Sequence, residues 1–387
     1  MKRSLSIAMV GTRGAPAHYG GFETAVEEIG VRLADRGHQV RVYCRTGNSD
    51  VTGTYRGMEL VTLPALRQRS LETLSHTGLS AFHLAAHRTD VAFLFNAANS
   101  PFLPVFRAAR IPVATHVDGL EWKRGKWGKG GQRYYRGAET ASVWMSDALI
   151  ADAQGIADYY LDEYNIPTEL IAYGAPIIED AGSGKLAELD LAPDAFHLAV
   201  ARFEPENHIH LIVEGYVRST AKLPLVVVGS APYANEYTAK IKAIAENDPR
   251  VRLLGGVWDQ ELLDQLYANA LTYLHGHSVG GTNPSLLRAI GAGAATSAFD
   301  VSFNREVVGE AGTFFANAED VARLVEAAEA DVPGQRARGV QLRERARAYD
   351  WDLVADGYED LAFRLAARTT PGTHFGRRRR KVKGSGK

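Results

Sequence analysis

A glycine-rich loop follows the first apolar segment of the chain and precedes an amphipathic helix. It reads GTRGAPAHYGGFET over residues 11–24. A nicotinamide-binding loop needs G-x-G-x-x-G with an acidic residue about 20 positions later, and a P-loop needs G-x-x-x-x-G-K-[ST]; this stretch has neither. Gly20 and Gly21 leave the backbone bare before the helix, which allows close approach of a diphosphate or a sugar. The alternative is that the glycines serve only tight turns.

A second stretch, ARFEPENHIHLIVEGY, covers residues 201–216. Arg202 closes a predicted strand, and Glu206 and Asn207 precede the next helix. An arginine at a strand end suits a diphosphate because the guanidinium donates to two oxygens at once. A surface ion pair is the other interpretation of Arg202.

A third stretch, HGHSVGGTNPSLLRAIGAG, covers residues 275–293. Asn283 and Pro284 have the residue types of an N-cap and of the first helical position. Gly280 and Gly281 leave the preceding backbone bare. The positive end of the helix dipole and free N–H groups at such a start favour an anion, so this stretch predicts a phosphate site.

Strand-like segments alternate with helical patterns and would position these three stretches. This alternation predicts parallel sheets covered by helices, with ligands beyond the carboxyl ends of the strands. A helix is predicted over 22–36, and strands are predicted over 6–11, 39–45, 91–97, 112–119, 147–153, 169–175, 197–203, 223–230, 251–256, 271–276 and 294–300.

Composition narrows the class of protein. One cysteine, Cys44, excludes an internal disulfide and favours a reducing cytoplasm. No apolar run reaches the roughly 18–20 residues of a membrane span. A net charge of −1 argues against a generally basic nucleic-acid-binding protein. We therefore expect a cytoplasmic protein without specific nucleic-acid binding.

Four motifs together make the chain resemble GT-B glycosyltransferases of glycosyltransferase family 4, and within them the rhamnosyltransferase-like subgroup. They are GTRGAPAHYGGFET, HVDGLEWKRGKW, ARFEPEN and GHSVGGTNPSLL. The resemblance implies an α/β fold of two doubly wound, Rossmann-like domains facing across a cleft, with a C-terminal helix crossing back. It also implies sugar transfer from a nucleotide donor, with retention of anomeric configuration and without a catalytic metal or other cofactor.

The resemblance divides the chain into five predicted parts. The N-terminal Rossmann-like acceptor domain is predicted over 1–178, a linker over 179–195, and the C-terminal Rossmann-like nucleotide-sugar domain over 196–350. The crossing helix is predicted over 351–368. A basic tail over 369–387, with seven cations and no acid from 377 onward, is predicted to be disordered because like charges repel.

The resemblance also implies roles for individual residues. Asp118, at the end of a first-domain strand, matches the region that presents a polar group to the sugar, and is the catalytic candidate. The donor-binding candidates are the residues that match the family's glycine loop, its diphosphate arginine and the helix start under the phosphates: Gly20, Gly21, Arg202, Glu206, Asn207, Gly281, Thr282, Asn283 and Arg288.

Two departures from the family pattern stand out. The lysine usually found a few residues after the arginine is missing, and Asn207 or His208 stands near its place. Arg288 replaces the second of two glutamates, the one that contacts the nucleotide ribose in the family. A cation cannot accept hydrogen bonds from ribose hydroxyls, so the ribose is held otherwise, Arg288 serves a donor phosphate, or transfer is impaired.

Basic and aromatic residues interleave in DGLEWKRGKWGKGGQRYYRG, residues 118–137. This composition suits a lipid-diphosphate acceptor or an anionic membrane surface; a solvated, basic helix start is the alternative. Peripheral membrane contact would involve the basic tail together with Lys123, Arg124, Lys126 and Lys129. The pairs His208/His210 and His275/His277 have no evident further metal ligands. Asp350 and Asp352 have the spacing of a metal-binding D-x-D, but they open the terminal helix, where an N-cap role is favoured; no metal is expected.

These observations predict a retaining, metal-independent glycosyltransferase in cell-surface polysaccharide synthesis. We expect it in the cytoplasm, with a peripheral location at the inner face of the membrane as the variant that the basic segments would allow. The donor would be a nucleotide-sugar, with dTDP-rhamnose as one candidate, and the acceptor a glycan or lipid-linked saccharide. Two alternatives stay open: a GT-B sugar-nucleotide epimerase, and a non-catalytic relative that binds a sugar nucleotide or a partner.

Overall fold

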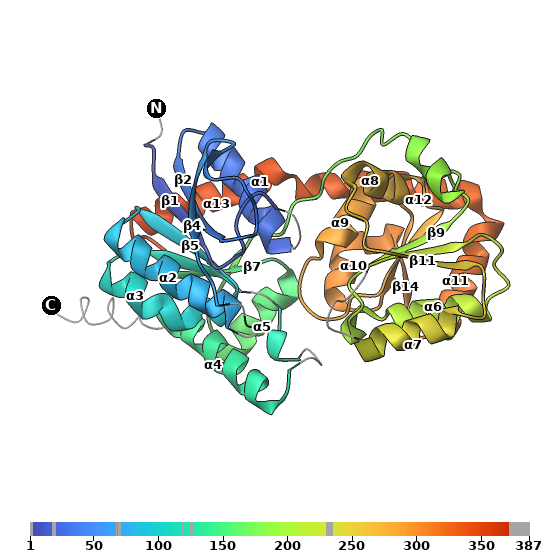
Figure 1. Ribbon diagram of the computed structural model, residues 1–387, viewed down its shortest axis with the longest axis horizontal. Helices are drawn as coiled ribbons and strands as arrows, with labels where there is room; N and C mark the ends of the chain where they lie inside the picture. Colours follow the sequence, from blue (N-terminus) through green and yellow to red (C-terminus); the bar gives the residue numbers. More distant parts are fainter. Residues whose placement is uncertain are drawn as a thin grey trace. The chain divides into compact units, whose positions relative to one another are not determined.

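The chain forms two compact units. The computed structural model describes residues 3–17, 21–66, 68, 71–117, 119–123, 127–229 and 235–370. The first unit contains Met1–Tyr173 and the chain from Trp351 onward, and the second unit is Gly174–Asp350. The chain therefore leaves the first unit, builds the second, and returns to the first (Figure 1).

The first unit is built on an eight-stranded sheet in the order β3-β4-β2-β1-β5-β6-β7-β8. Only the β3–β4 pair is antiparallel; the other neighbours are parallel. The strands are β1 (Ser6–Val10), β2 (Gln39–Arg45), β3 (Gly53–Tyr55), β4 (Met58–Leu63), β5 (Val91–Phe95), β6 (Val113–His116), β7 (Ala148–Ala151) and β8 (Glu169–Leu170).

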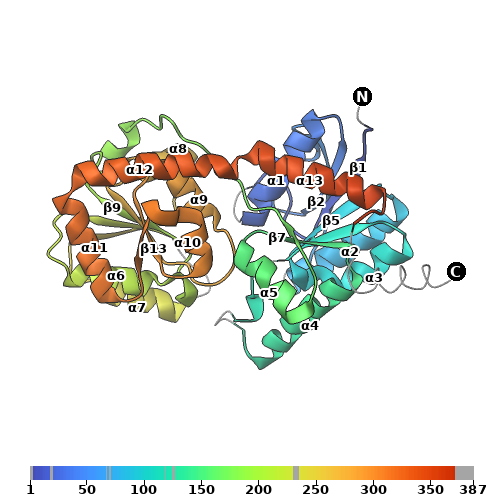
Figure 2. The same cartoon turned by 180° about the vertical axis from the view of Figure 1, so that it is seen from behind.

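Helices cover both faces of this sheet because its central strands carry apolar side chains on both sides. Ala8 and Val10 of β1 share a core with α2 and α3, whereas Phe93 of β5 packs against Tyr358 of α13. Figure 2 shows α13 beside α1. The helices are α1 (Gly21–Asp35), α2 (Glu72–Ala86), α3 (Leu103–Ala108), α4 (Lys129–Met145), α5 (Gln154–Tyr164) and α13 (Trp351–Ala366), with 3-10 helices η1 (Ala97–Phe102) and η2 (Glu121–Lys123).

The second unit has a six-stranded parallel sheet in the order β11-β10-β9-β12-β13-β14. Its strands are β9 (His197–Val200), β10 (Leu225–Val228), β11 (Val251–Gly255), β12 (Thr272–His275), β13 (Thr296–Phe299) and β14 (Thr313–Phe315).

The helices of the second unit also lie on both faces of the sheet. Leu225, Val227 and Leu274 of the strands pack with residues of α6, α7 and α11 in one buried core, and in Figure 1 α6 and α7 lie along one side of the strands with α8 and α12 along the other. The helices are α6 (Ile209–Arg218), α7 (Asn235–Ala245), α8 (Gln260–Asn269), α9 (Pro284–Gly291), α10 (Ser302–Val308), α11 (Ala318–Ala330) and α12 (Val332–Ala346), with η3 (Gly184–Leu189), η4 (Pro205–Asn207), η5 (Gly309–Ala311) and η6 (Arg347–Tyr349).

These two sheets confirm the predicted α/β architecture of two doubly wound, Rossmann-like domains. The boundary after the first unit lies at 173/174, whereas the sequence placed it at 178/179. The segment predicted as a linker, 179–195, belongs to the second unit. It contains η3, whose Leu186 is fully buried against the unit, so the turn-rich composition conceals one anchoring apolar residue. The predicted tail lies outside the described residues beyond Thr370.

Candidate active site

Two loops of the second unit meet where the strand order of its sheet reverses. β9 pairs with β10 on one side and with β12 on the other, and ligands of open α/β sheets bind in the crevice at such a switch point. The loops after β9 and β12 carry six of the predicted donor-binding residues: Arg202, Glu206, Asn207, Gly281, Thr282 and Asn283.

Hydrogen bonds hold these two loops together. The side-chain Nδ2 of Asn207 donates to the Arg202 carbonyl at 2.8 Å. The side-chain Oδ1 of Asn207 is thereby oriented to accept. The His277 ring lies with Nδ1 2.6 Å from that Oδ1 and therefore donates from Nδ1. The Ser278 N–H and hydroxyl both donate to the Glu206 carbonyl at 3.0 Å. Residues 202–207 and 277–278 thus form one polar platform.

Gly276 allows the backbones of the two loops to touch. A Cβ at Gly276 would lie 2.1 Å from the Asn207 carbonyl oxygen, a separation that only backbone movement could relieve. His208 adds a second link, because its Nδ1 donates to the Gly276 carbonyl at 2.8 Å. The sequence pattern identified this stretch, but Gly276 and His277 were not among the residues predicted to form the site. The sequence feature that could have indicated them is Gly276 between His275 and His277 at the end of a predicted strand.

Arg202 presents its guanidinium to solvent beside the platform. Its side chain is 45% exposed, and its nearest ionic neighbour is a Glu204 oxygen at 3.7 Å, which is too long for a strong hydrogen bond. The surface ion pair that was the alternative interpretation of Arg202 is thus present, but it is long and leaves the guanidinium partly exposed. A guanidinium so placed can donate to two oxygens of an anionic ligand.

The start of α9 confirms the predicted capping. Asn283 is the N-cap and Pro284 occupies the first helical position. The Asn283 Oδ1 accepts from the Ser285 N–H at 2.9 Å and from the Ser285 hydroxyl at 2.7 Å. The Ser285 amide is thus already used and Pro284 has none, so fewer free N–H groups remain than the sequence suggested. The positive end of the helix dipole still faces the loop.

Arg288 lies one turn into α9 and is already paired. Its Nη1 donates to the Asp264 Oδ1 of α8. This ion pair compensates the positive charge of Arg288, the charge that would otherwise attract a donor phosphate.

The opening loop of the first unit is shaped by packing at two of its four glycines. Gly11 and Gly14 have positive φ angles of 105° and 103°. A Cβ on either would lie 2.4 Å from an atom of the neighbouring strands, the Phe95 carbonyl or the Cys44 sulfur. These two glycines therefore fit the tight-turn interpretation. Gly21 is the first residue of α1, whereas Gly20 and Asp118 lie outside the described residues.

Carboxylates of α1 occupy two amides of the same loop. Glu23 accepts from the Arg13 N–H at 3.1 Å, and Glu27 accepts from the Ala17 N–H at 2.6 Å. These two amides are therefore already used and are not available to a donor phosphate; Glu27 is also paired with Arg56 at 3.2 Å.

His116 ends β6, two residues before the predicted catalytic Asp118. It is buried and packs against the rings of Phe22 and Phe95. Its Nδ1 lies 3.0 Å from the Tyr358 hydroxyl of α13. Burial lowers the pKa of His116 to about 3. In the second unit, burial likewise lowers the pKa of His275, which ends β12, to about 3.

We expect acid to destabilise both units through these neutral histidines. The unfolded chain protonates them below about pH 6.5, whereas the folded chain resists protonation down to about pH 3. Their contribution is therefore complete above pH 6.5 and is lost as the pH falls, by roughly 1.4 kcal/mol per pH unit for each histidine. Denaturant unfolding at pH 7, 5.5 and 4.5 measures this slope. His116→Phe should reduce it, and an unchanged slope in that variant would contradict the assignment.

The basic and aromatic segment before and within α4 is largely occupied by its own contacts. The Arg136 guanidinium lies 4.7 Å from the Trp122 ring centroid and pairs with Glu139 and Glu163. Lys123 also lies over Trp122. Lys123 and Lys129 are exposed, whereas Arg124 and Lys126 lie outside the described residues. Within the described parts of the chain, no helix has the length and apolar character to cross a bilayer.

Three residues of the histidine and aspartate pairs named in the sequence analysis make contacts within the protein. The His208 ring stacks on the Phe299 ring, with 4.1 Å between the ring centroids. The His210 Nδ1 lies within hydrogen-bond distance of the Tyr237 hydroxyl, and Asp352 pairs with Arg32. Over the described ranges, no group of three or more His, Cys, Asp or Glu side chains is placed to hold a metal ion.

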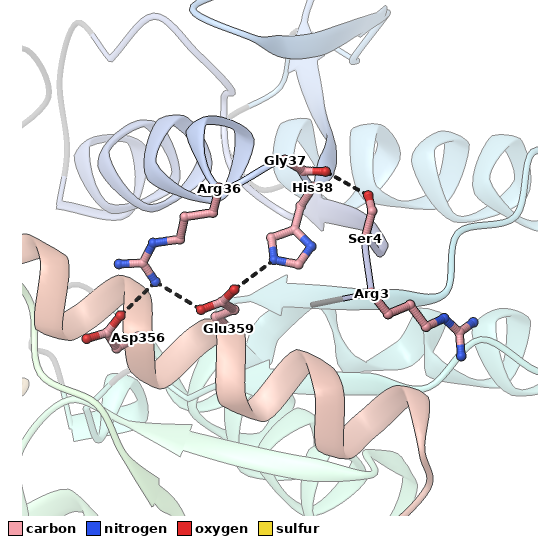
Figure 3. Close-up of a pocket in the computed structure, with 7 residues that line it drawn as sticks. All are labelled: Arg3, Ser4, Arg36, Gly37, His38, Asp356 and Glu359. Atoms are coloured by element: carbon pink, nitrogen blue, oxygen red, sulfur yellow. Dashed lines mark hydrogen bonds and ion pairs between the residues drawn. The ribbon is translucent and has the colours of Figure 1, made fainter. Parts of the chain in front are cut away.

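A pocket of about 590 Å³ lies in the first unit, away from the strand ends that carry the site. It is lined by residues before β1, after α1 and on α13 (Figure 3). Glu359 contacts both the His38 Nε2, at 3.0 Å, and Arg36, and Asp356 also pairs with Arg36. Since these residues lie at the amino ends of β1 and β2, the pocket serves the docking of α13 rather than the switch-point site.

Family models match both units of the chain. Residues 20–174 match the glycosyl transferase 4-like domain, and residues 189–348 match glycosyl transferases group 1. A search of curated proteins by sequence gave no significant match.

Solved structures share the fold at low sequence identity. Sucrose-phosphate synthase from Thermosynechococcus elongatus is 21% identical, with a TM-score of 0.79 over 94% of this chain and 100% of that one. Anabaena HepE in complex with UDP-glucose is 15% identical, with a TM-score of 0.75 over 92% and 99%. A glycosyltransferase from Rickettsia africae is 12% identical, with a TM-score of 0.70 over 94% and 98%.

The likeness to these structures concerns the fold, whereas the two domain matches concern the family. Both agree with the two doubly wound sheets. The chain is a GT-B glycosyltransferase in which a glycosyl transferase 4-like domain is followed by a glycosyl transferases group 1 domain.

Proposed function

We propose that this glycosyltransferase takes its sugar from a nucleoside-diphosphate donor bound at the second unit's switch point, and transfers it with retention of anomeric configuration. The acceptor would be a glycan or a lipid-linked saccharide of a cell-surface polysaccharide. One observation carries the proposal: an exposed arginine, Arg202, stands beside a platform that is hydrogen-bonded to the loop leading into α9.

The donor class follows from the chemistry of that platform. Arg202 can bind two diphosphate oxygens, and the dipole of α9 favours negative charge at its start. The Anabaena HepE structures contain UDP or UDP-glucose, which supports a nucleotide-sugar donor here. dTDP-rhamnose remains the candidate suggested by the subgroup resemblance.

The mechanism requires stabilisation of a leaving nucleoside diphosphate. As the bond from the sugar to the diphosphate breaks, negative charge grows on the phosphate oxygens. Preorganised donors such as Arg202 and the start of α9 stabilise that charge more in the transition state than in the ground state. Asp118 is proposed to orient the sugar or the acceptor hydroxyl, and the proposal needs no metal ion.

The acceptor is proposed to bind on the first unit. Glu23 and Glu27 already accept from two amides of the opening loop, which favours a sugar over a phosphate there. Exposed Lys129, and exposed Lys123 over the Trp122 ring, would suit an anionic part of a lipid-linked acceptor, or the surface of the membrane that carries it.

Nucleotide binding is the first test. We expect one of UDP, dTDP or GDP to bind in calorimetry and to raise the melting temperature, because a ligand of the folded state stabilises it. No binding by any of the three would refute the donor assignment.

Labelled donor sugars, with and without a membrane extract, then test transfer. We expect product only with extract, retained configuration by NMR of the product anomer, and activity in the presence of a chelator. Conversion of the donor without extract would indicate an epimerase instead, and binding without any conversion would indicate a non-catalytic relative.

A further inference from the structure

The ion pair between α8 and α9 leaves one carboxylate oxygen available. The Asp264 Oδ1 accepts from Arg288 and also from the Gln260 Nε2, at 3.1 Å. The Oδ2 of Asp264 accepts no hydrogen bond from the residues that the structure describes. Both side chains of the pair are partly open to solvent, Asp264 at 26% and Arg288 at 24%. An oriented acceptor therefore faces water beside α9.

The position of this oxygen fits the part of a donor that lies beyond its phosphates. Arg288 follows the N-cap Asn283 by five residues, or about 7.5 Å along the helix axis at 1.5 Å per residue. A nucleoside diphosphate carries its ribose directly on the inner phosphate. With the diphosphate at the start of α9, the ribose lies beyond it, and the pair with Arg288 places Asp264 beside that part of α9.

We infer that Asp264 accepts the hydrogen bond from the ribose 3′-hydroxyl of the donor and that Arg288 is the positioning residue that holds this carboxylate. The inference rests on the proposed function. A carboxylate only accepts hydrogen bonds, and a bond from a neutral hydroxyl to it is charge-assisted. Arg288 alone could not accept from that hydroxyl, so the acceptor at this place comes from α8.

Stability does not require the second oxygen of Asp264. Arg288 holds one carboxylate oxygen, which leaves the other as an acceptor for a ligand hydroxyl. Because the pair is only partly exposed, breaking it can cost more than breaking a fully exposed pair, so each variant is first checked by denaturant unfolding. Variants that keep a cooperative unfolding transition then test the inference by binding.

The discriminating experiment compares three probes in calorimetry: the tightest-binding nucleoside diphosphate of UDP and dTDP, its 3′-deoxy analogue, and inorganic pyrophosphate. The wild-type protein should prefer the nucleotide with the 3′-hydroxyl by about tenfold. In Asp264→Asn the amide oxygen stays with Arg288 and Gln260, so an NH2 group replaces the free oxygen. That variant should lose the preference while its affinity for pyrophosphate stays within about twofold of the wild-type value.

Arg288 variants separate positioning from phosphate binding. Arg288→Met should reduce the 3′-hydroxyl preference and leave pyrophosphate affinity unchanged. Arg288→Glu places two carboxylates together and should weaken nucleotide binding, although it restores the glutamate typical of the family. The double variant Asp264→Arg/Arg288→Glu restores a pair with one carboxylate and should recover the preference. Glu214→Gln, which breaks an ion pair on α6, is the matched control.

Each outcome decides the inference. Equal affinity for the nucleotide and its 3′-deoxy analogue, or an unchanged preference in Asp264→Asn, would overturn it while leaving the proposed function in place. A loss of pyrophosphate binding in Arg288→Met would assign Arg288 to the phosphates instead. Failure of every probe to bind the wild-type protein would overturn the proposed function, and the ribose contact with it.

Discussion

Arg202→Ala should weaken nucleoside-diphosphate binding by roughly 1.5–3 kcal/mol, the range for hydrogen bonds to charged groups. That corresponds to a loss of affinity of about 10- to 150-fold. The reason is that the guanidinium is 45% exposed beside the platform and that its ion pair with Glu204 is long, at 3.7 Å. Titration calorimetry with the nucleotide and with pyrophosphate measures the effect. Both ligands should lose affinity equally, because the contact is to phosphate.

The matched control for this variant is Arg218→Ala. Arg218 is similarly exposed, at 50%, and belongs to the same unit. It is the last residue of α6, so it lies at the opposite edge of the sheet, and its pairs with Glu214 and Glu319 are surface contacts. Its removal should leave the affinity unchanged. Equal losses in the two variants would show that Arg202 acts only through general charge.

Gly276→Ala should disrupt the platform itself. The new methyl would lie 2.1 Å from the Asn207 carbonyl oxygen, and a backbone atom cannot move aside by changing rotamer. Relief requires the loops after β9 and β12 to separate, which breaks the bonds from His277 and Ser278. We expect a loss of about 1–3 kcal/mol in the free energy of unfolding of the second unit, together with at least about tenfold weaker pyrophosphate binding.

Gly184→Ala provides the comparison in the same unit. Nothing lies within 4 Å of the position where its Cβ would stand, so stability should change by less than about 0.5 kcal/mol and binding should not change. Denaturant unfolding and calorimetry on both variants give the answer. Gly276→Ala that binds pyrophosphate as tightly as the wild-type protein would contradict the role of the platform.

Much of the fold could be predicted from local sequence. The strand predicted over 39–45 is β2 as observed, and the helix predicted over 22–36 is α1 shifted by one residue. Apolar runs that are buried on both faces make such segments recognisable. β3 and β14, with three residues each, are too short to show a pattern, and β4 alternates weakly. The run over 169–175 is apolar but pairs at only two residues, in β8, because burial there does not come from the sheet.

The candidate site also contains features that local sequence predicts and features that it does not. The N-cap at Asn283 is a local feature and was predicted correctly. The contact of Gly276 with Asn207 and the pairing of Arg288 with Asp264 join residues distant in sequence. Nothing in the sequence alone selects those partners, since any of several carboxylates could have neutralised Arg288. The contacts of Gly11 with Phe95 and of Gly14 with Cys44 likewise join residues distant in sequence, so the glycines alone could not show that these two positions serve turns.

The return of the chain to its first unit has a consequence for synthesis on the ribosome. α13 contributes Trp351, Tyr358, Leu361 and Leu365 to the interior of that unit, yet these residues are translated after the whole of the second unit. The second unit is one continuous segment, 174–350, and can complete its fold as soon as it emerges. Until α13 is translated, the first unit has an exposed apolar face beside β5. A chain truncated after Asp350 and released from the ribosome should therefore contain a protease-resistant second unit and a protease-sensitive first unit.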